Sequence, residues 1–489
     1  MKDASCATVW PVSQVPAWDM ESDVVVVGLG VAGGAAAIDA ARAGAEVLVL
    51  ERASGGGGAT ALAGGLFYFG GGTPIQKACG FEDDKEEMFK YLMLASGKNA
   101  DEAKVRLYCE ENLEHFDWVV GLGVEFKESY HKEKTTLPEN DDCLCYSGNE
   151  LAYPFLSHAK PAPRGHKPKI EGDAGGLLMQ KVISAAQEAG AKIVYEAIAE
   201  TLVTDEQGRV VGLLAFVDRQ PKFVRARKGV VLAAGGFVMN KEMLRKHAPE
   251  LLACNYPIGT DGDDGRGICM GEAAGGAIMN MSQGLLSTPF YPPAAHLKGI
   301  LVNGQGQRFI NEDVYHGRSS DAILRQQNGK AYLIVDDSLY GQTQAFHKIV
   351  AVEETFDDLE KALEMPEGSL SYTIEFFNKH AAEGEDPLFH KHKDYLRPLS
   401  SPPYAALNCS TDKAIFAVFT LGGLDTLPTG EVLRVDGSVV PGLFAAGRTT
   451  AGLPREGCCY SSGMSIAGAS FFGRYAGRTA AQGTDSQSK

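Results

Sequence analysis

The sequence "DVVVVGLGVAGGAAAIDAARAGAEVLVLE", from Asp23 to Glu51, carries the clearest structural pattern in the chain. Its valines read as a buried strand over 24–27, and glycines in GxGxxG spacing follow. A run of small residues then predicts a helix, and a second strand over 46–50 ends in Glu51. Such a unit places a pyrophosphate at the helix N-terminus, where unpaired N–H groups favour anions, and places the acid on a ribose hydroxyl. The stretch therefore predicts dinucleotide binding; the alternative is tight helix-on-sheet packing without a ligand.

Glycine clusters recur along the chain beside apolar runs, as in "GGGGATALAGG" over 55–65. Glycine allows backbone to approach a ligand closely, so the repeated clusters suggest a long cofactor lying on main chain. Two later segments, 228–237 and 435–450, each predict a buried strand that ends in glycine. A nicotinamide cofactor needs only one strand–helix–strand crossover, whereas FAD in glutathione-reductase-like folds is also held by a distant C-terminal segment. We therefore expect FAD.

Composition narrows the class of partner. The 46 basic and 62 acidic residues give a net charge of -16, which disfavours nucleic acid and anionic membrane surfaces. We find no secretion signal and no apolar window long enough to span a membrane. The ten cysteines show no CxxC spacing, so we expect free thiols and no iron–sulfur or haem site. These features predict a cytoplasmic protein that acts on small molecules.

Seven motifs in order resemble the fumarate reductase/succinate dehydrogenase flavoprotein family. After the N-terminal GxGxxG they are "GGGGATALAGG", "VVLAAGGF", "TDGDDGRGICMGEAAGGA", "VNGQGQRFINE", "FTLGGL" and "GLFAAG". The resemblance covers nearly the whole chain. It implies an α/β, Rossmann-like FAD domain of the glutathione-reductase type, built from both chain ends over 1–279 and 416–489. An α+β catalytic domain would be inserted over 280–415.

The resemblance also implies which residues hold the cofactor. Backbone N–H groups of the turn from Gly463 to Ile466 would face the pyrimidine edge of the flavin. The histidine that links flavin covalently in the family is absent from 55–65, so FAD is expected to bind noncovalently. The expected cofactor-binding residues are Gly28, Gly30, Ala32, Gly33, Glu51, Arg52, Ala59, Thr60, Ala63, Gly64, Gly65, Ala234, Gly235, Asp263, Gly447, Arg448, Gly463, Met464, Ser465 and Ile466.

Three positions depart from the fumarate reductases. Those enzymes bind a dicarboxylate with one histidine and two arginines, and this chain has Phe419, Tyr315 and Tyr460 at or near these places. A dianion cannot be desolvated without paired cations. We therefore expect a neutral substrate that carries a hydrogen-bond acceptor.

The two tyrosines resemble those of the 3-ketosteroid dehydrogenases, a branch of the same family. Some members form the 1,2 double bond of ring A, and others form the 4,5 double bond of 5α-reduced steroids. Tyr460 followed by Ser462 looks more like the second kind. The 1,2 reaction remains an alternative, and dicarboxylate reduction a weaker one. A flavin-binding electron carrier with no substrate pocket is the alternative from a different class. The electron acceptor and the oligomeric state stay open.

The resemblance implies a division of labour among Tyr315, Tyr460 and Ser462. Tyr460 would donate a hydrogen bond to the C3 oxygen, where charge builds as C4 loses its proton. Ser462 would accept that proton and Tyr315 would relay it outward, because a serine alkoxide alone is too costly near neutral pH. Tyr315 as the direct base is the alternative. A packing role for either tyrosine and a helix-capping role for Ser462 also remain possible. We expect His316, Arg318, Cys458 and Cys459 to be structural.

Overall fold

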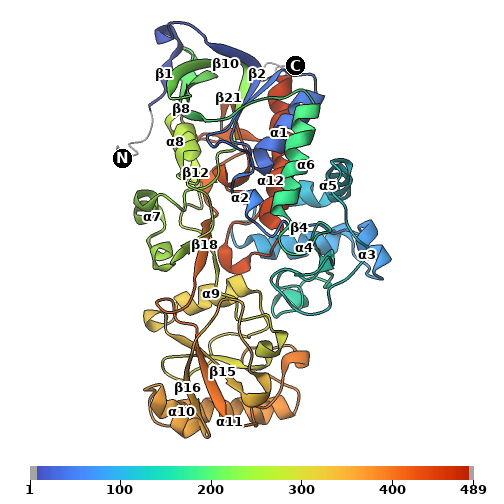
Figure 1. The fold of residues 1–489 in the computed structure, drawn as a ribbon, viewed down its shortest axis with the longest axis vertical. Coiled ribbons are helices and arrows are strands. Elements are labelled where there is room, and N and C mark those ends of the chain that lie inside the picture. Colours follow the sequence, from blue (N-terminus) through green and yellow to red (C-terminus); the bar gives the residue numbers. More distant parts are fainter. Residues whose placement is uncertain (1–7, 484–489) are drawn as a thin grey trace.

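A nine-stranded sheet, which we call the central sheet, lies in the upper part of the larger lobe in Figure 1. The computed structural model describes residues 8–483. Along the sheet lie β1 (Trp10–Pro11), β8 (Ala197–Thr204), β9 (Val210–Val217), β10 (Gln220–Leu232), β2 (Met20–Val27), β3 (Val47–Leu50) and β7 (Lys192–Val194). From the last part of the chain, β21 (Val439–Ala445) pairs with β10, and β20 (Glu431–Leu433) pairs with β21.

The strand–helix–strand unit expected at the start of the chain is confirmed. β2 and β3 pair in parallel, with Val24 opposite Val47, and α1 (Val31–Arg42) connects them. Val24 and Val26 are fully buried in the core that includes residues of α1 and α12, and Val25 is fully buried in a second core with residues of β8 and β9. The buried strand expected within 435–450 is also confirmed. It is β21, which joins the same sheet and runs parallel to β10 with Leu443 opposite Val230.

The helix α12 (Met464–Gln482) packs along α1, and α1 also packs against α6 (Gly175–Glu188) (Figure 1). The helices meet through glycine. A Cβ at Gly473 would lie 2.4 Å from the carbonyl oxygen of Ala32, and one at Gly477 would lie 2.1 Å from that of Ala36. The two chain ends therefore share one closely packed core.

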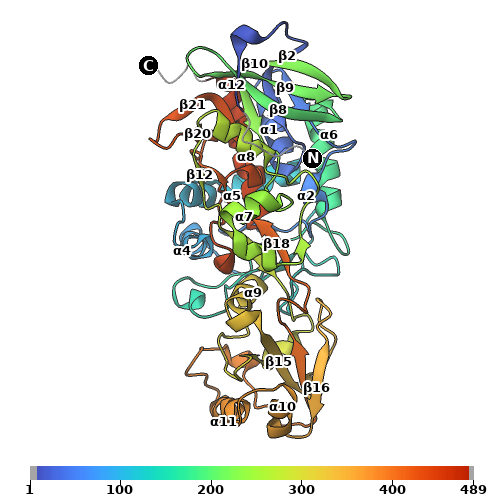
Figure 2. The same cartoon turned by 90° about the vertical axis from the view of Figure 1, so that its left-hand side faces the viewer.

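The smaller lobe carries a four-stranded antiparallel sheet (Figures 1 and 2). Its order is β14 (Ile300–Asn303), β15 (Ala331–Asp336), β17 (Tyr404–Asn408) and β16 (Ile349–Glu353). The helices of this lobe are α9 (His316–Leu324), α10 (Phe356–Ala362) and α11 (Ser369–Ala382). An antiparallel sheet with helices beside it is the α+β arrangement expected for this part of the chain.

A short sheet lies where the two lobes meet (Figure 1). It consists of β11 (Tyr256–Pro257), β18 (Ala417–Thr420) and β13 (Gly284–Ser287), with Leu285 opposite Phe419. Two crossings of the chain between the lobes run through this sheet. It therefore fixes how the lobes are joined.

The remaining elements flank these sheets. A third small sheet consists of β4 (Phe67–Tyr68), β6 (Gly165–His166) and β5 (Leu144–Cys145). The other helices and strands are α2 (Gly58–Ala61), α3 (Pro74–Ala78), α4 (Lys85–Ser96), α5 (Glu102–Gly121), α7 (Lys241–His247), α8 (Arg266–Ala273), β12 (Ile278–Met279) and β19 (Gly423–Leu424), besides short 3-10 turns. Across residues 8–483, none of the helices has the length and apolar character needed to span a bilayer.

Candidate active site

A cavity of about 1080 Å³ extends from the central sheet to the junction of the lobes. Residues from both chain ends and from the smaller lobe line it. Tyr315, Tyr460 and Ser462 all face it, and so do the residues expected to bind the cofactor, except Gly33 and Met464. Residues expected from distant motifs thus meet at one place.

Gly33 and Met464 lie behind the cavity wall. A Cβ at Gly33 would lie 1.9 Å from the carbonyl oxygen of Gly28, so this glycine permits the turn to close on the helix. Met464 is fully buried at the first position of α12 and packs in the core of the larger lobe. Both residues therefore support the cavity wall from behind and do not line the cavity.

At the N-terminus of α1 the cavity is lined by accessible backbone and by Glu51. We call this part of the cavity the cofactor cradle. Gly30 is the N-cap, and a Cβ placed there would meet nothing closer than 3.8 Å. The backbone is therefore accessible where the helix dipole favours an anion. Glu51 directly follows β3, and its carboxylate accepts hydrogen bonds from the N–H groups of Leu29 and Ala53, at 2.7 and 2.9 Å. This donor set fits the pyrophosphate and ribose of a dinucleotide.

Asp263 holds the turn at Gly235 on the opposite wall. Its carboxylate accepts hydrogen bonds from the N–H groups of Gly236 and Thr260, at 2.9 and 2.8 Å, and pairs with Arg448 at 3.1 Å. Because Asp263 neutralises it, Arg448 is not a free cation for a substrate carboxylate.

Tyr315, Tyr460 and Ser462 lie together at the lobe junction. Tyr315 is the N-cap of α9, while Tyr460 and Ser462 lie just before α12. The hydroxyl of Tyr315 lies 2.8 Å from Oγ of Ser462, and the ring centres of the two tyrosines are 6.1 Å apart. Both tyrosines are at least 95% buried, so the group sits away from bulk water.

The Tyr460 hydroxyl accepts a hydrogen bond from the N–H of Ser465, at 3.3 Å. This leaves its own proton free to donate to a ligand. The same hydrogen bond uses the N–H of Ser465, which was expected to face the flavin edge.

Burial controls the protonation of the phenols. It raises the pKa of Tyr315 well above its ordinary value, an effect that Tyr460 reinforces and the hydrogen bond to Ser462 opposes. Burial likewise raises the pKa of Tyr460, against the hydrogen bond from Ser465. Both side chains are therefore neutral phenols near neutral pH. Tyr315 can relay a proton only by releasing its own as it receives another.

His316 lies next to Tyr315 and also lines the cavity. Its Nδ1 lies 3.0 Å from Oγ of Ser287. Burial, assisted by Lys134, lowers the pKa of His316 to about 3. This imidazole is therefore neutral and does not supply the cation that a dicarboxylate would need.

The short sheet at the junction provides an apolar wall. Alternate residues of one segment, Ile415, Ala417 and Phe419, line the cavity, and Leu285 and Pro289 face it from the β13 side. The rings of Phe419 and Tyr460 are nearly perpendicular, with their centres 5.8 Å apart. A flat apolar ligand can lie along this wall with its polar end at the tyrosines.

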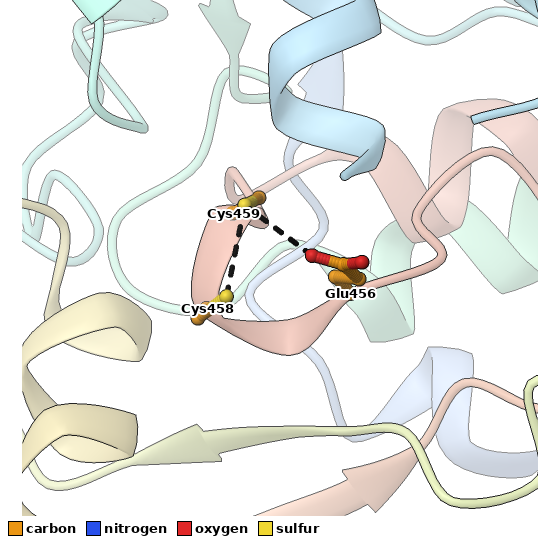
Figure 3. A group of neighbouring side chains, drawn as sticks. All are labelled: Glu456, Cys458 and Cys459. Carbon is orange, nitrogen blue, oxygen red and sulfur yellow. Dashed lines mark hydrogen bonds between the residues drawn. The ribbon is translucent and has the colours of Figure 1, made fainter. Parts of the chain in front are cut away.

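Cys458 and Cys459 form a turn with Glu456 just before Tyr460 (Figure 3). Sγ of Cys459 lies 3.6 Å from Sγ of Cys458 and 4.0 Å from the carboxylate of Glu456. None of the three lines the cavity.

Comparisons with known proteins agree with this geometry. The family model "FAD binding domain" matches residues 23–458. A solved structure of 3-ketosteroid-Δ4-(5α)-dehydrogenase from Rhodococcus jostii RHA1, in complex with 4-androstene-3,17-dione, is 45% identical. It superimposes with a TM-score of 0.92 over 97% of this chain and 99% of that one.

Two curated relatives show the breadth of the similarity. The 3-oxo-5-alpha-steroid 4-dehydrogenase of Comamonas testosteroni is 30% identical over 88% of this chain and 93% of its own length. The fumarate reductase (cytochrome) of Shewanella frigidimarina is 29% identical over 94% of this chain and 77% of its own length. The chain belongs to the FAD-binding flavoprotein family that the model describes, and FAD is its cofactor.

Sequence reasoning missed the residues that hold the group in place. Ser147 bonds to Ser462, and Asn149 bonds to the backbone of Tyr315. Neither belongs to a motif, and only the folded chain brings their segment near the tyrosines.

Proposed function

We propose that this protein is an FAD-dependent dehydrogenase of 3-keto-5α-steroids that introduces the C4–C5 double bond. The observation that carries the proposal is the Tyr315–Ser462 hydrogen bond beside Tyr460, in an apolar cavity that also holds the cofactor cradle. A ketone needs a donor at its oxygen and a base at the neighbouring carbon. This group offers both.

In the proposed reaction Tyr460 donates its hydroxyl proton in a hydrogen bond to the C3 oxygen and stabilises the charge that develops there. Ser462 takes the proton from C4 while its own hydroxyl proton passes to Tyr315. In the same step Tyr315 gives its own phenolic proton to water in the cavity, because burial disfavours a standing phenolate. When bound, FAD supplies the acceptor for the hydride that leaves C5.

The cofactor is proposed to bind noncovalently. The turn at Gly28 and the start of α1 would hold the pyrophosphate, Glu51 a ribose, and the residues around Gly463 the flavin edge. We also propose residues 280–415 as the substrate domain, with 1–279 and 416–489 as the FAD domain. Their support is the cavity, which draws its cradle from both chain ends and Tyr315 from the smaller lobe.

The relatives named above support the steroid substrate. The Rhodococcus structure contains 4-androstene-3,17-dione, and the Comamonas relative is named as a 3-oxo-5-alpha-steroid 4-dehydrogenase. Dicarboxylate reduction is disfavoured because Arg448 is paired with Asp263 and His316 is neutral. The 1,2 reaction differs only in which carbons face the base and the flavin, so it is tested by product analysis.

The decisive experiment adds 5α-androstane-3,17-dione to the oxidised protein without another electron acceptor. We expect bleaching of the flavin absorbance and a 4-ene-3-keto product. A 1-ene product would replace the proposal with the 1,2 reaction. Reoxidation of the reduced flavin by fumarate, with no response to steroid, would overturn it.

A further inference from the structure

A segment with no sequence motif lies against Tyr315 and Ser462. It is "SGN", Ser147 to Asn149, which follows β5 in the larger lobe. We call it the clamp. It does not line the cavity, yet it contacts the backbone of both residues that share the 2.8 Å hydrogen bond.

Ser147 holds Ser462 through two hydrogen bonds. The N–H of Ser462 donates to the carbonyl of Ser147 at 2.9 Å, and the hydroxyl of Ser147 donates to the carbonyl of Ser462, also at 2.9 Å. The pair resembles a short strand pairing, and it fixes the backbone that carries the Ser462 hydroxyl.

Asn149 holds Tyr315 from the same segment. Its Oδ1 accepts a hydrogen bond from the Tyr315 N–H at 2.8 Å. On the next residue, the His316 N–H donates to the hydroxyl of Tyr291 at 2.9 Å. The start of α9 is therefore tied on both sides of the Tyr315 Cα.

The clamp is itself rigidly anchored. Tyr91 accepts a hydrogen bond from the Asn149 N–H and bonds to Ser461, both at 2.7 Å. Glu150 accepts from the Gly148 N–H at 2.8 Å. A Cβ at Gly148 would lie 2.0 Å from Oγ of Ser461, so only glycine lets the clamp approach so closely.

Tyr315 and Ser462 come from different lobes, at the starts of α9 and α12. A small displacement of one lobe would stretch their bond, and proton transfer requires a separation of about 2.6–3.2 Å. We propose that Ser147 and Asn149 are positioning residues that set the Tyr315–Ser462 distance across the lobe junction. This inference rests on the proposed function, because it assigns the clamp to the same proton transfer.

The test compares Asn149→Ala with Asn112→Ala in the FAD-loaded protein. Asn112 is a matched control: like Asn149 it is fully buried, and its Oδ1 accepts a backbone N–H at 2.8 Å, in this case that of Gly70. We expect Asn149→Ala to lower kcat by about tenfold to a hundredfold. KM and FAD content should stay near wild type, and Asn112→Ala should keep kcat.

A double-mutant cycle separates positioning from general weakening. In a Tyr315→Phe background the relay is already lost, so Asn149→Ala should add little further loss of kcat. An equal loss in both backgrounds, an equal loss in Asn112→Ala, or an unchanged kcat in Asn149→Ala would each overturn the inference.

A readout without substrate keeps the clamp testable if the steroid reaction itself fails. Hydrogen exchange of the peptide that contains Tyr315 should accelerate in Asn149→Ala and remain unchanged in Asn112→Ala, because the Tyr315 N–H loses its acceptor. Wild-type protein that does not oxidise the steroid contradicts the proposed function. Unchanged exchange at Tyr315 contradicts the clamp.

Discussion

The direction of a single hydrogen bond defines the role of Tyr460. Because its oxygen accepts from the Ser465 N–H, its proton is free to point into the cavity. The same contact brings the phenol to the N-terminus of α12, where the helix dipole favours negative charge. The site can therefore stabilise an enolate without a cation.

Tyr460→Phe removes this donor and keeps the ring that packs against Phe419. We expect FAD content to be retained and kcat with a 5α-3-ketosteroid to fall by about a hundredfold, as for loss of one oxyanion donor worth about 3 kcal/mol. Steady-state kinetics and the flavin spectrum measure both. Tyr372→Phe, on the exposed surface of α11, is the matched control. A Tyr460→Phe enzyme with wild-type turnover would remove the assigned role.

The pH dependence of kcat/KM should reflect Tyr315 rather than His316. Loss of the phenolic proton becomes easier as the pH rises, and burial places the pKa of Tyr315 well above 10, so the rate should climb through the alkaline range. No inflection is expected near pH 6.5, because His316 has a pKa of about 3. A pH profile from 6 to 10 measures this, and Tyr315→Phe should flatten the alkaline rise. A plateau beginning near pH 7 would contradict the assignment.

Tyr315, Tyr460 and Ser462 could be predicted as one site because each stands at a recognisable motif position. Ser147 and Asn149 escaped prediction for a physical reason. They act through backbone hydrogen bonds to residues far away in the chain, and such bonds leave no pattern of residue types. The hydrogen bond from the Ser465 N–H to the Tyr460 hydroxyl could not be predicted either, since it depends on the rotamer of Tyr460.

Among the elements, β10 and the α1–α12 pair determine where the cofactor cradle forms. The buried strand expected over 228–237 is longer at its start and ends at Leu232, before the glycines. Gly235 leaves the strand with a φ of 83°, a left-handed conformation that turns the chain towards Asp263. Strand cores were thus predictable from apolar runs, whereas strand ends followed from backbone conformation.

Gly477→Ala tests the contact between α12 and α1. Its methyl group would lie 2.1 Å from the Ala36 carbonyl oxygen, so the helices must separate and the cradle must distort. We expect a lower melting temperature and a smaller fraction of bound FAD after purification. Gly121→Ala, at the end of α5 with open space around it, is the control and should leave both unchanged. Full FAD occupancy in Gly477→Ala would show that the close approach is not required.

On the scale of the whole molecule, buried neutral histidines link stability to pH. Burial lowers the pKa of His166 and His347 to about 4 and that of His316 to about 3, and holds that of His115 well below its ordinary value. In the unfolded chain each would take up a proton near pH 6.5. Their contribution to stability is therefore complete above about pH 6.5 and is lost as the pH falls towards 4.

Denaturant unfolding at a series of pH values measures this loss. We expect the free energy of unfolding to fall by several kcal/mol between pH 7 and pH 4.5, because each histidine loses about 1.4 kcal/mol for each pH unit below 6.5 until its folded-state pKa is reached. The raised pKa values of the buried acids Glu150 and Asp313 act in the opposite direction and reduce the slope. A stability that stays flat or rises on acidification would contradict the expectation.

The pairing of β21 and β2 with the same strand, β10, also has a consequence for synthesis on the ribosome. β2 and β10 are synthesised first, whereas β21 and α12 follow about two hundred residues later in the chain. The sheet therefore lacks one neighbour of β10 until β21 has been synthesised. We therefore expect stable binding of the flavin only after β21 and α12 have been synthesised.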